Sequence, residues 1–120
     1  MKKIVLVLCA VVIALFVSTP SWAAFTCDGK VNTLALEPQN GFLWLSTGYG
    51  VHFLCNVASI QNNVDPAMCR TLYTMLMAAK LSGKTIRQHY DHAGTSGKSC
   101  STLGSWSAPD PLPYFVEILD

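Results

Sequence analysis

The part of the sequence that decides the fold is a strand pattern followed by a helix pattern. Residues 51–57 read VHFLCNV, and residues 65–83 read DPAMCRTLYTMLMAAKLSG. Apolar residues at every odd position of the first stretch give the period of two that is typical of a half-buried strand. This interpretation places His52 on the outward face of the strand, at the surface.

The second stretch has the signals that begin and end an amphipathic helix. Asp65 is a suitable N-cap, and Pro66 fits the first helical position, where its missing N–H costs nothing. Gly83 suits the left-handed residue that closes a helix. Apolar residues recur between them at helical spacing, so we expect this face to lie against a sheet. They are Cys69, Leu72, Leu76 and Ala79.

Working outward, two further strands precede this unit and two follow it. Residues 31–37 and 42–46 are predicted strands joined by an Asn40-Gly41 turn, and residues 47–50 form the next turn. Residues 84–90 and 114–119 are the last two strands. The order of three strands, one helix and two strands predicts a mainly β, α+β fold. It fits a small five-stranded closed barrel with a helix across one end, the plan of the OB-fold.

The N-terminus resembles a cleavable export signal. Lys2 and Lys3 precede an unbroken apolar run, residues 4–17, which is too short to span a bilayer comfortably. Small residues before position 24 predict cleavage after Ala23. We therefore expect residues 1–23 to be a signal peptide and residues 24–120 to form a single domain in the periplasm or outside the cell.

Cys9 offers an alternative, because a cysteine behind an apolar run resembles the lipid-attachment site of bacterial lipoproteins. That site needs a small residue just before the cysteine, and here it is Leu8. We therefore expect Cys9 to leave with the signal peptide.

Charge argues against two classes of partner. The chain has 8 basic and 7 acidic residues, and loss of Lys2 and Lys3 leaves 8 − 2 = 6 against 7. No basic run remains that would hold nucleic-acid phosphates. Nothing after Val17 is long and apolar enough to span a membrane, so we expect neither partner for the mature chain.

Four cysteines follow the signal peptide, and an even number in an exported chain predicts two disulfides. Zinc is the competing explanation, but the spacings contain no C-x-x-C pair. Three pairings are possible, and spacing alone does not choose among them. Since Cys55 and Cys69 both lie on apolar faces of neighbouring elements, we favour Cys55 with Cys69 and Cys27 with Cys100.

The helix and the strand after it resemble a known family. Thr71-Leu72-Tyr73 and the stretch SGKTIRQHY at residues 82–90 are similar to the B subunits of subtilase-type and pertussis-like bacterial toxins. The resemblance spans roughly residues 42–90. It implies an exported OB-fold domain that forms five-membered rings and binds host-cell glycans.

The sequence departs from that family in two places. Asp28 precedes Gly29-Lys30-Val31, where the family has a serine that contacts sialic acid, and an aspartate would repel a carboxylated sugar. No cysteine in the second predicted strand could bridge to Cys55. The resemblance therefore supplies no binding residue for this chain.

No catalytic, metal or cofactor motif is present. His89-Tyr90-Asp91-His92 is the densest group of possible ligands, but no third nearby side chain completes a metal site. No serine lies in a Gly-x-Ser-x-Gly elbow, and the acids are scattered. We expect neither an enzyme nor a cofactor.

Three aromatic residues are the candidates for ligand binding, because flat rings stack on sugars. Tyr49 lies in a glycine turn, which predicts exposure. Trp44 shares a strand face with Phe42, which favours a place in the core, and Trp106 could instead pack over a disulfide.

Two hypotheses of different classes follow. The first is an exported, non-enzymatic module that binds a glycan or a protein surface, with a homo-oligomeric ring such as a pentamer as one possible assembly. The alternative is a monomeric periplasmic accessory or inhibitor protein. A small secreted hydrolase ranks behind both.

Overall fold

The computed structural model describes residues 24–90 and 97–120. Four features of the sequence predictions lie outside these residues. They are the signal peptide at 1–23 with its cut after Ala23, Cys9, Asp91 and His92.

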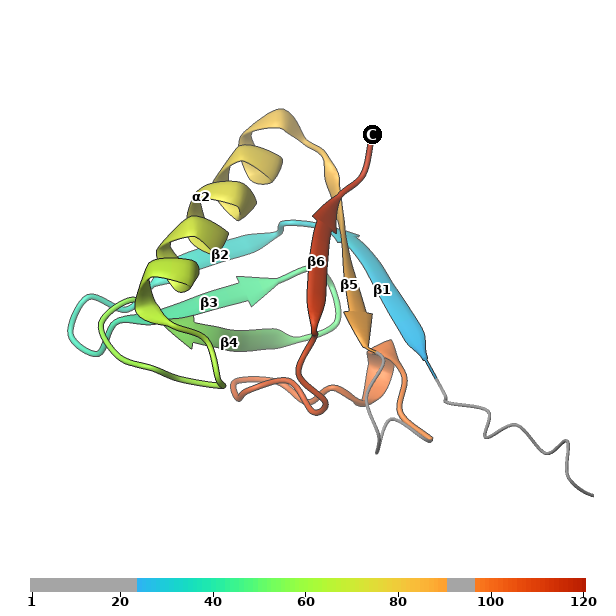
Figure 1. Cartoon of the computed structure of the whole chain (residues 1–120). Coiled ribbons are helices and arrows are strands. Elements are labelled where there is room, and N and C mark those ends of the chain that lie inside the picture. The colour runs from blue at the N-terminus through green and yellow to red at the C-terminus, as the bar shows by residue number, and fades with distance from the viewer. Residues whose placement is uncertain (1–23, 91–96) are drawn as a thin grey trace, which may run out of the picture.

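The described chain contains six strands, one α-helix and one short 3-10 turn (Figure 1). In chain order these are β1 Phe25–Lys30, β2 Thr33–Leu36, β3 Phe42–Ser46, β4 Val51–Asn56, α2 Pro66–Ser82, β5 Thr85–Tyr90, η1 Cys100–Thr102 and β6 Phe115–Ile118. The predicted α+β class is confirmed, whereas the predicted count of five strands is wrong.

The additional strand is β1, which has no alternating pattern in its sequence FTCDGK. It is a strand because all six of its residues pair antiparallel with β5, from Phe25 opposite Tyr90 to Lys30 opposite Thr85. The strand predicted at residues 31–37 corresponds to β2, which begins two residues later than predicted, at Thr33. Val31 turns its side chain into the core, and the Asn32 N–H donates to the Ser46 carbonyl, so the chain passes here from one sheet to the other.

The strands form two antiparallel three-stranded sheets, with orders β1-β5-β6 and β2-β3-β4. Figure 1 shows the sheets at an angle to each other, with α2 across one side of the space between them. The helix contacts β4 in one sheet and β5 in the other. It therefore covers the interior that the two sheets share.

The two sheets do not close into a barrel within the described residues, so the predicted closure is not observed. The free edge of β4 is instead met by residues 105–107, which form a parallel bridge between Ser107 and His52. The Phe53 N–H donates to the Ser107 carbonyl at 3.1 Å, and the Trp106 N–H donates to the Val51 carbonyl at 2.6 Å. This irregular segment occupies the edge where a closing strand would lie.

The predicted helix boundaries are confirmed. Asp65 accepts a hydrogen bond from the Ala67 N–H at 2.8 Å, Pro66 begins the helix, and Gly83 ends it with φ of 67°. Cys69, Leu76 and Ala79 are buried, while Leu72 packs at the margin of the core. The helical spacing in the sequence therefore identified the buried face.

On β3 the core lies on the opposite face from the one predicted. Leu43 and Leu45 are buried, whereas Phe42 and Trp44 point to the other side. On β4 a bulge at Leu54 changes the alternation, because Leu43 opposes Cys55 while Trp44 opposes Phe53.

The bulge accounts for the error over His52. His52 opposes Leu45 on the inward face and is only 4% exposed, so its predicted surface position is wrong. The Asn62 side-chain amide donates to the carbonyls of Phe53 and Leu54, which satisfies backbone groups beside the bulge.

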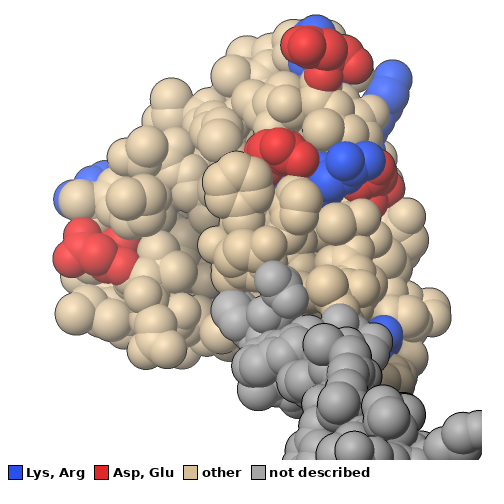
Figure 2. All heavy atoms as spheres, turned by 45° about the vertical axis from the view of Figure 1, so that its right-hand side comes forward, with Lys and Arg blue, Asp and Glu red and all other residues tan. Residues whose placement is uncertain are grey.

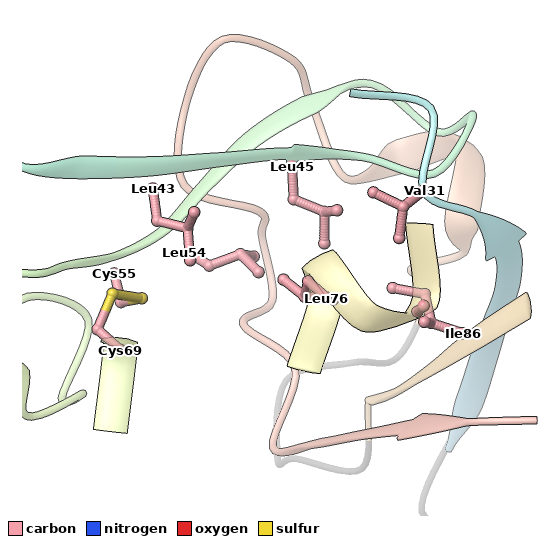
Figure 3. Packing of buried hydrophobic residues seen from close by; sticks show 9 residues of the cluster. Val31, Leu43, Leu45, Leu54, Cys55, Cys69, Leu76 and Ile86 are labelled. Atoms are coloured by element: carbon pink, nitrogen blue, oxygen red, sulfur yellow. A yellow bond between two sulfur atoms is a disulfide. The ribbon is translucent and has the colours of Figure 1, made fainter. Parts of the chain in front are cut away.

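Both predicted disulfides are present, Cys55–Cys69 and Cys27–Cys100. The first joins β4 to α2 within the main core (Figure 3). That core contains Val31, Leu43, Leu45, Leu54, Cys55, Cys69, Leu76, Ala79 and Ile86. The second joins β1 to η1 beside a smaller core of Cys27, Tyr90 and Leu103. Two disulfides are consistent with an oxidising compartment outside the cytoplasm.

Candidate functional site

The outer surface of the β2-β3-β4 sheet carries a cluster of four aromatic side chains, which we call the aromatic face. It consists of Phe42 and Trp44 on β3, Phe53 on β4, and Trp106. The Trp44 and Phe53 rings are cross-strand partners with centroids 5.5 Å apart, and Phe42 lies 5.2 Å from Phe53. Trp106 lies 5.8 Å from Trp44 with its plane inclined by 53°. The two indole rings are therefore inclined to each other and are not stacked.

The members of the aromatic face differ greatly in exposure. Phe42, Trp44 and Phe53 are half-buried, whereas Trp106 is 74% exposed. Exposing most of a tryptophan forgoes about 1.5–3 kcal/mol of possible burial. Its backbone is also in the left-handed region, with φ of 57°, which is uncommon for a bulky residue. Such an outlier motivates a functional hypothesis.

A carboxylate is fixed at the rim of the aromatic face. Glu37 follows β2, and its Oε2 accepts a hydrogen bond from the Trp44 indole N–H at 3.3 Å. Its Oε1 accepts one from the Asn40 side-chain amide. Each oxygen retains acceptor capacity, so the rim can receive further hydrogen bonds from hydroxyl groups.

The segment that carries Trp106 is attached to β4 through several hydrogen bonds. Besides the two backbone bonds of Phe53 and Trp106, the Val51 N–H donates to the Ser105 hydroxyl at 3.1 Å. The buried His52 Nε2 lies 3.0 Å from the Gly104 carbonyl oxygen. Because a carbonyl oxygen only accepts, Nε2 carries the proton. The ring of Trp106 is therefore presented from an anchored segment.

The three predicted binding residues occupy two places. Trp44 and Trp106 come together on the aromatic face, so Trp44 is not the core residue that its pairing with Phe42 predicted. The ring contact of Trp106 is with Trp44. Tyr49 is exposed, as predicted, but has no ring contact with either tryptophan among the described residues. Its hydroxyl donates to the Asp28 carbonyl at 3.1 Å.

Sequence reasoning missed Phe53 and Glu37 and did not assign Phe42 to the aromatic face. Aromatic residues at positions 42 and 44, next to a third at 53 across a tight turn, were the available signal. They indicate one sheet face, but the alternation alone does not show that Leu43 and Leu45 on the other face are the buried residues.

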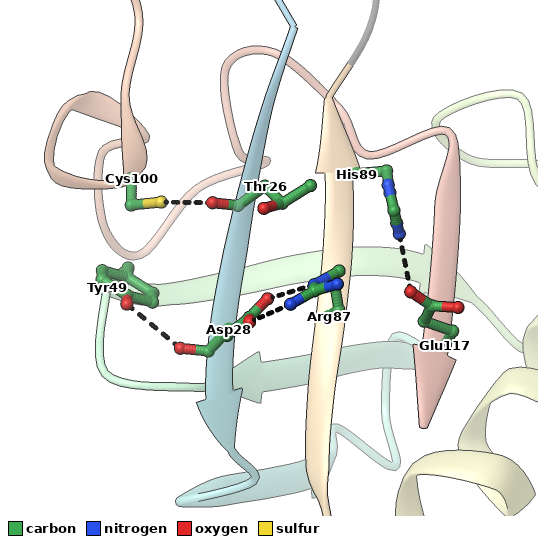
Figure 4. A network of polar contacts seen from close by, with 7 residues as sticks. All are labelled: Thr26, Asp28, Tyr49, Arg87, His89, Cys100 and Glu117. Atoms are coloured by element: carbon green, nitrogen blue, oxygen red, sulfur yellow. Dashed lines mark hydrogen bonds and ion pairs between the residues drawn. The ribbon is translucent and has the colours of Figure 1, made fainter. Parts of the chain in front are cut away.

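A separate polar network lies on the outer surface of the β1-β5-β6 sheet (Figure 4). Arg87 on β5 makes two hydrogen bonds to the Asp28 carboxylate on β1, at 2.7 and 2.6 Å. The hydrogen bond from Arg87 holds the pKa of Asp28 below its usual value. The negative charge of Asp28 is therefore compensated by Arg87. Asp28 would repel an anionic sugar less strongly than the sequence alone suggests.

His89, the described histidine of the predicted ligand cluster, belongs to the same surface. Its Nε2 lies 3.0 Å from the Glu117 carboxylate on β6, and its ring contacts Tyr114 and Phe115. In the parts of the chain that are described, no three His, Cys, Asp or Glu side chains are grouped to hold a metal ion. A hydrogen bond to Glu117 and aromatic packing account for the position of His89.

The acidic side chains on this side of the molecule lie next to basic ones. Figure 2 shows basic and acidic side chains next to one another, separated by wide uncharged areas. Two of the ion pairs are Lys84–Asp120 and Arg87–Asp28. The drawn face therefore presents no extended patch of one sign.

An apolar groove of about 290 Å³ lies between α2 and the segment ending in β6, and we call it the α2–β6 groove. Met68, Leu72 and Met75 line one wall, and Tyr114, Phe115 and Val116 line the other. Within the described residues β6 pairs only with β5, so its other edge lies open beside the groove. No described helix is long and apolar enough to cross a membrane.

No family model, curated protein or solved structure matches this chain. The site must therefore be interpreted from its own geometry.

Proposed function

We propose that this protein is an exported, non-enzymatic module that binds a glycan on its aromatic face. The observation that carries the proposal is Trp106, which is 74% exposed at a positive φ and anchored 5.8 Å from Trp44. A sugar ring presents C–H groups on its faces and hydroxyls on its rim. The two inclined indoles can pack against the C–H groups of the sugar faces. The fixed carboxylate beside them can accept hydrogen bonds from the hydroxyls on the rim.

The charge at the rim favours neutral sugars. Glu37 would accept hydrogen bonds from hydroxyl groups, but it would repel a carboxylated or sulfated sugar. No Lys or Arg side chain among the described residues is hydrogen-bonded to Glu37 to compensate its charge. We therefore propose a neutral hexose or a neutral oligosaccharide as the ligand class.

The fold we propose is a partly open OB-like barrel. In its support, β1 and β2 act as one bent strand shared by the two sheets, and α2 lies between β4 and β5 in sequence. The parallel bridge between Ser107 and His52 lies at the edge where closure would be completed. A ring of identical subunits, such as a pentamer, accompanies this proposal through the resemblance to toxin B subunits.

A second candidate function is a monomeric periplasmic accessory or inhibitor protein. The α2–β6 groove favours it, because apolar residues around the groove are exposed beside an open strand edge. Met68 is 61% exposed and Phe115 is 50% exposed. These side chains would be covered by a protein partner.

The test is a broad glycan array probed with the exported protein and with single variants. We expect binding to neutral glycans, with at least about a tenfold loss of affinity in Trp106→Ala, as for an exposed aromatic anchor. Tyr49→Ala is the matched control, since it removes an exposed aromatic ring from a different place.

Three outcomes would oppose this proposal. No signal on the array would favour the accessory function, and binding lost in Tyr49→Ala but kept in Trp106→Ala would place the site at the glycine turn. Exclusive binding of anionic sugars would contradict the role of Glu37. Light scattering separates the assemblies, because a monomer at micromolar concentration would exclude the ring.

A further inference from the structure

We propose that His52 is a positioning residue that sets the place of Trp106 on the aromatic face. This inference rests on the proposed function for its effect on affinity, but not for its effect on geometry. The contact that carries it is the hydrogen bond from His52 Nε2 to the Gly104 carbonyl, at 3.0 Å.

His52 is a polar side chain at a buried position, where its presence requires a specific interaction. It is 4% exposed on the inward face of β4, opposite Leu45. An apolar residue there would add to the core, whereas an imidazole must have its polar atoms satisfied. Its described side-chain hydrogen bond goes to Gly104, two residues before Trp106. The buried donor is therefore committed to the segment that presents the indole.

The attachment has two sides that together determine the backbone of Trp106. From the interior, His52 holds the Gly104 carbonyl. From the edge of β4, the Val51 carbonyl receives the Trp106 N–H, and the Ser107 carbonyl receives the Phe53 N–H. Trp106 lies between these points with φ of 57°. A strained backbone persists only where its surroundings fix it on both sides.

Loss of the donor would have a specific consequence. The Gly104 carbonyl would lack its buried partner, and residues 104–106 could relax toward an ordinary φ. The indole of Trp106 would then leave its position near Trp44. The edge bonds of β4 alone would keep the segment nearby without fixing the ring.

The experiment uses circular dichroism, because two indoles this close couple their transitions and give a characteristic couplet. Trp106→Phe defines the signal of the Trp44–Trp106 pair in the exported protein. His52→Leu keeps side-chain bulk without a donor. His52→Asn supplies an amide donor, but its side chain is one bond too short to reach the Gly104 carbonyl. His52→Gln supplies an amide donor whose reach is similar to that of the His52 Nε2 atom. Thr47→Val is the matched control, since it removes a buried hydrogen bond to Gln88 that does not involve the Trp106 segment.

We expect the couplet to be lost in His52→Leu and His52→Asn, and to be kept in His52→Gln and Thr47→Val. Glycan affinity should fall about tenfold in the first two variants. It should fall no further when either change is combined with Trp106→Ala, because both changes remove the same contact.

A folded His52→Leu or His52→Asn protein with an unchanged couplet would overturn the proposal. If His52→Leu does not fold, His52→Asn and His52→Gln still decide it, because equal couplets in these two would show that the donor's reach is irrelevant. If the wild type binds no glycan, the proposed function fails, while the couplet continues to test His52. The two failures are therefore distinguishable.

Discussion

The carbonyl oxygen of Gly104 lies 2.3 Å from the position that a Cβ atom on Gly50 would occupy. The Trp106 segment, which runs along the edge of β4, thus approaches the preceding turn at a residue that has no side chain. We expect Gly50→Ala to destabilise the fold by about 2 kcal/mol more than Gly48→Ala and to displace Trp106. Gly48 is a close control, since its φ of 105° matches the 108° of Gly50, but the nearest described atom to its Cβ position beyond its chain neighbours is the Asn32 side-chain nitrogen at 3.8 Å. Equal losses of stability in thermal unfolding would contradict the close approach.

Tyr90 is fully buried, and its hydroxyl has no hydrogen-bond partner among the described residues. We expect Tyr90→Phe to raise the free energy of unfolding by about 1 kcal/mol, because the variant removes an unsatisfied polar atom and keeps the ring stacked on Phe25. Urea unfolding at neutral pH measures this. Tyr49→Phe, at an exposed hydroxyl, should change stability by less than about 0.5 kcal/mol. A loss of stability in Tyr90→Phe would show that the hydroxyl has a stabilising partner.

Because Tyr90 is buried, the free energy of unfolding should depend on pH in the alkaline range. Burial raises the pKa of Tyr90 well above its usual value, so the folded chain retains a proton that the unfolded chain releases above about pH 10. The associated stability is present below pH 10 and is lost as the pH rises further. We expect the unfolding free energy of the wild type to fall more steeply than that of Tyr90→Phe in this range. Parallel curves would contradict the assignment.

The Asp28–Arg87 pair predicts a small effect at acid pH. Arg87 holds the pKa of Asp28 below its unfolded value of about 3.9, so the stabilisation is present above that pH and disappears as the pH falls through the folded value. Both side chains are more than a third exposed, so we expect Asp28→Asn to cost less than about 1 kcal/mol at neutral pH. The stability curves of the wild type and Asp28→Asn should approach each other toward the acid end of a series from about pH 2 to 7, because protonation of Asp28 removes the stabilisation. A constant difference across the range would argue against the ion pair.

The two disulfides should differ in their contributions to stability. In the chain-entropy model, the 14-residue separation of Cys55–Cys69 corresponds to about 3 kcal/mol, and the 73-residue separation of Cys27–Cys100 to about 4 kcal/mol. We therefore expect the double alanine variant at Cys27 and Cys100 to lower the melting temperature more than that at Cys55 and Cys69. Calorimetry of both variants tests the order. The reverse order would mean that packing in the main core outweighs loop closure.

Local signals in the sequence were sufficient for the helix and for the Cys55–Cys69 disulfide, and Cys27–Cys100 followed because only those two cysteines remained. Asp65, Pro66 and Gly83 define the helix through capping chemistry that acts within a few residues. Cys55 and Cys69 were paired because both lie on apolar faces of adjacent elements. Such features depend on short-range geometry, which a sequence carries directly.

Features that depend on distant pairing were not predicted. β1 is a strand because β5 lies beside it, and nothing in FTCDGK indicates this. The bulge at Leu54 brings Cys55 to the same buried side as His52 and Leu54, so the regular alternation of β4 placed His52 at the surface. The alternation of β3 did not show which of its two faces is buried. The encounter of Trp44 with Trp106 depends on a segment docked 62 residues later in the sequence (106 − 44). Of the four aromatic residues of the candidate site, only Trp44 and Trp106 were therefore named from the sequence, and their grouping was not predicted.

The two disulfides are nested: the Cys55–Cys69 loop lies wholly inside the loop closed by Cys27 and Cys100. If the chain is exported from its N-terminus, as proposed, Cys27 reaches the oxidant first and Cys55 is the next thiol to follow. Oxidation in order of emergence would join these two and trap a non-native bridge. Native material then requires thiol–disulfide exchange that frees Cys27 from Cys55, so that Cys27 can be oxidised with Cys100 once that cysteine has emerged. We therefore expect secretion yield to depend on a disulfide isomerase, and not on an oxidase alone.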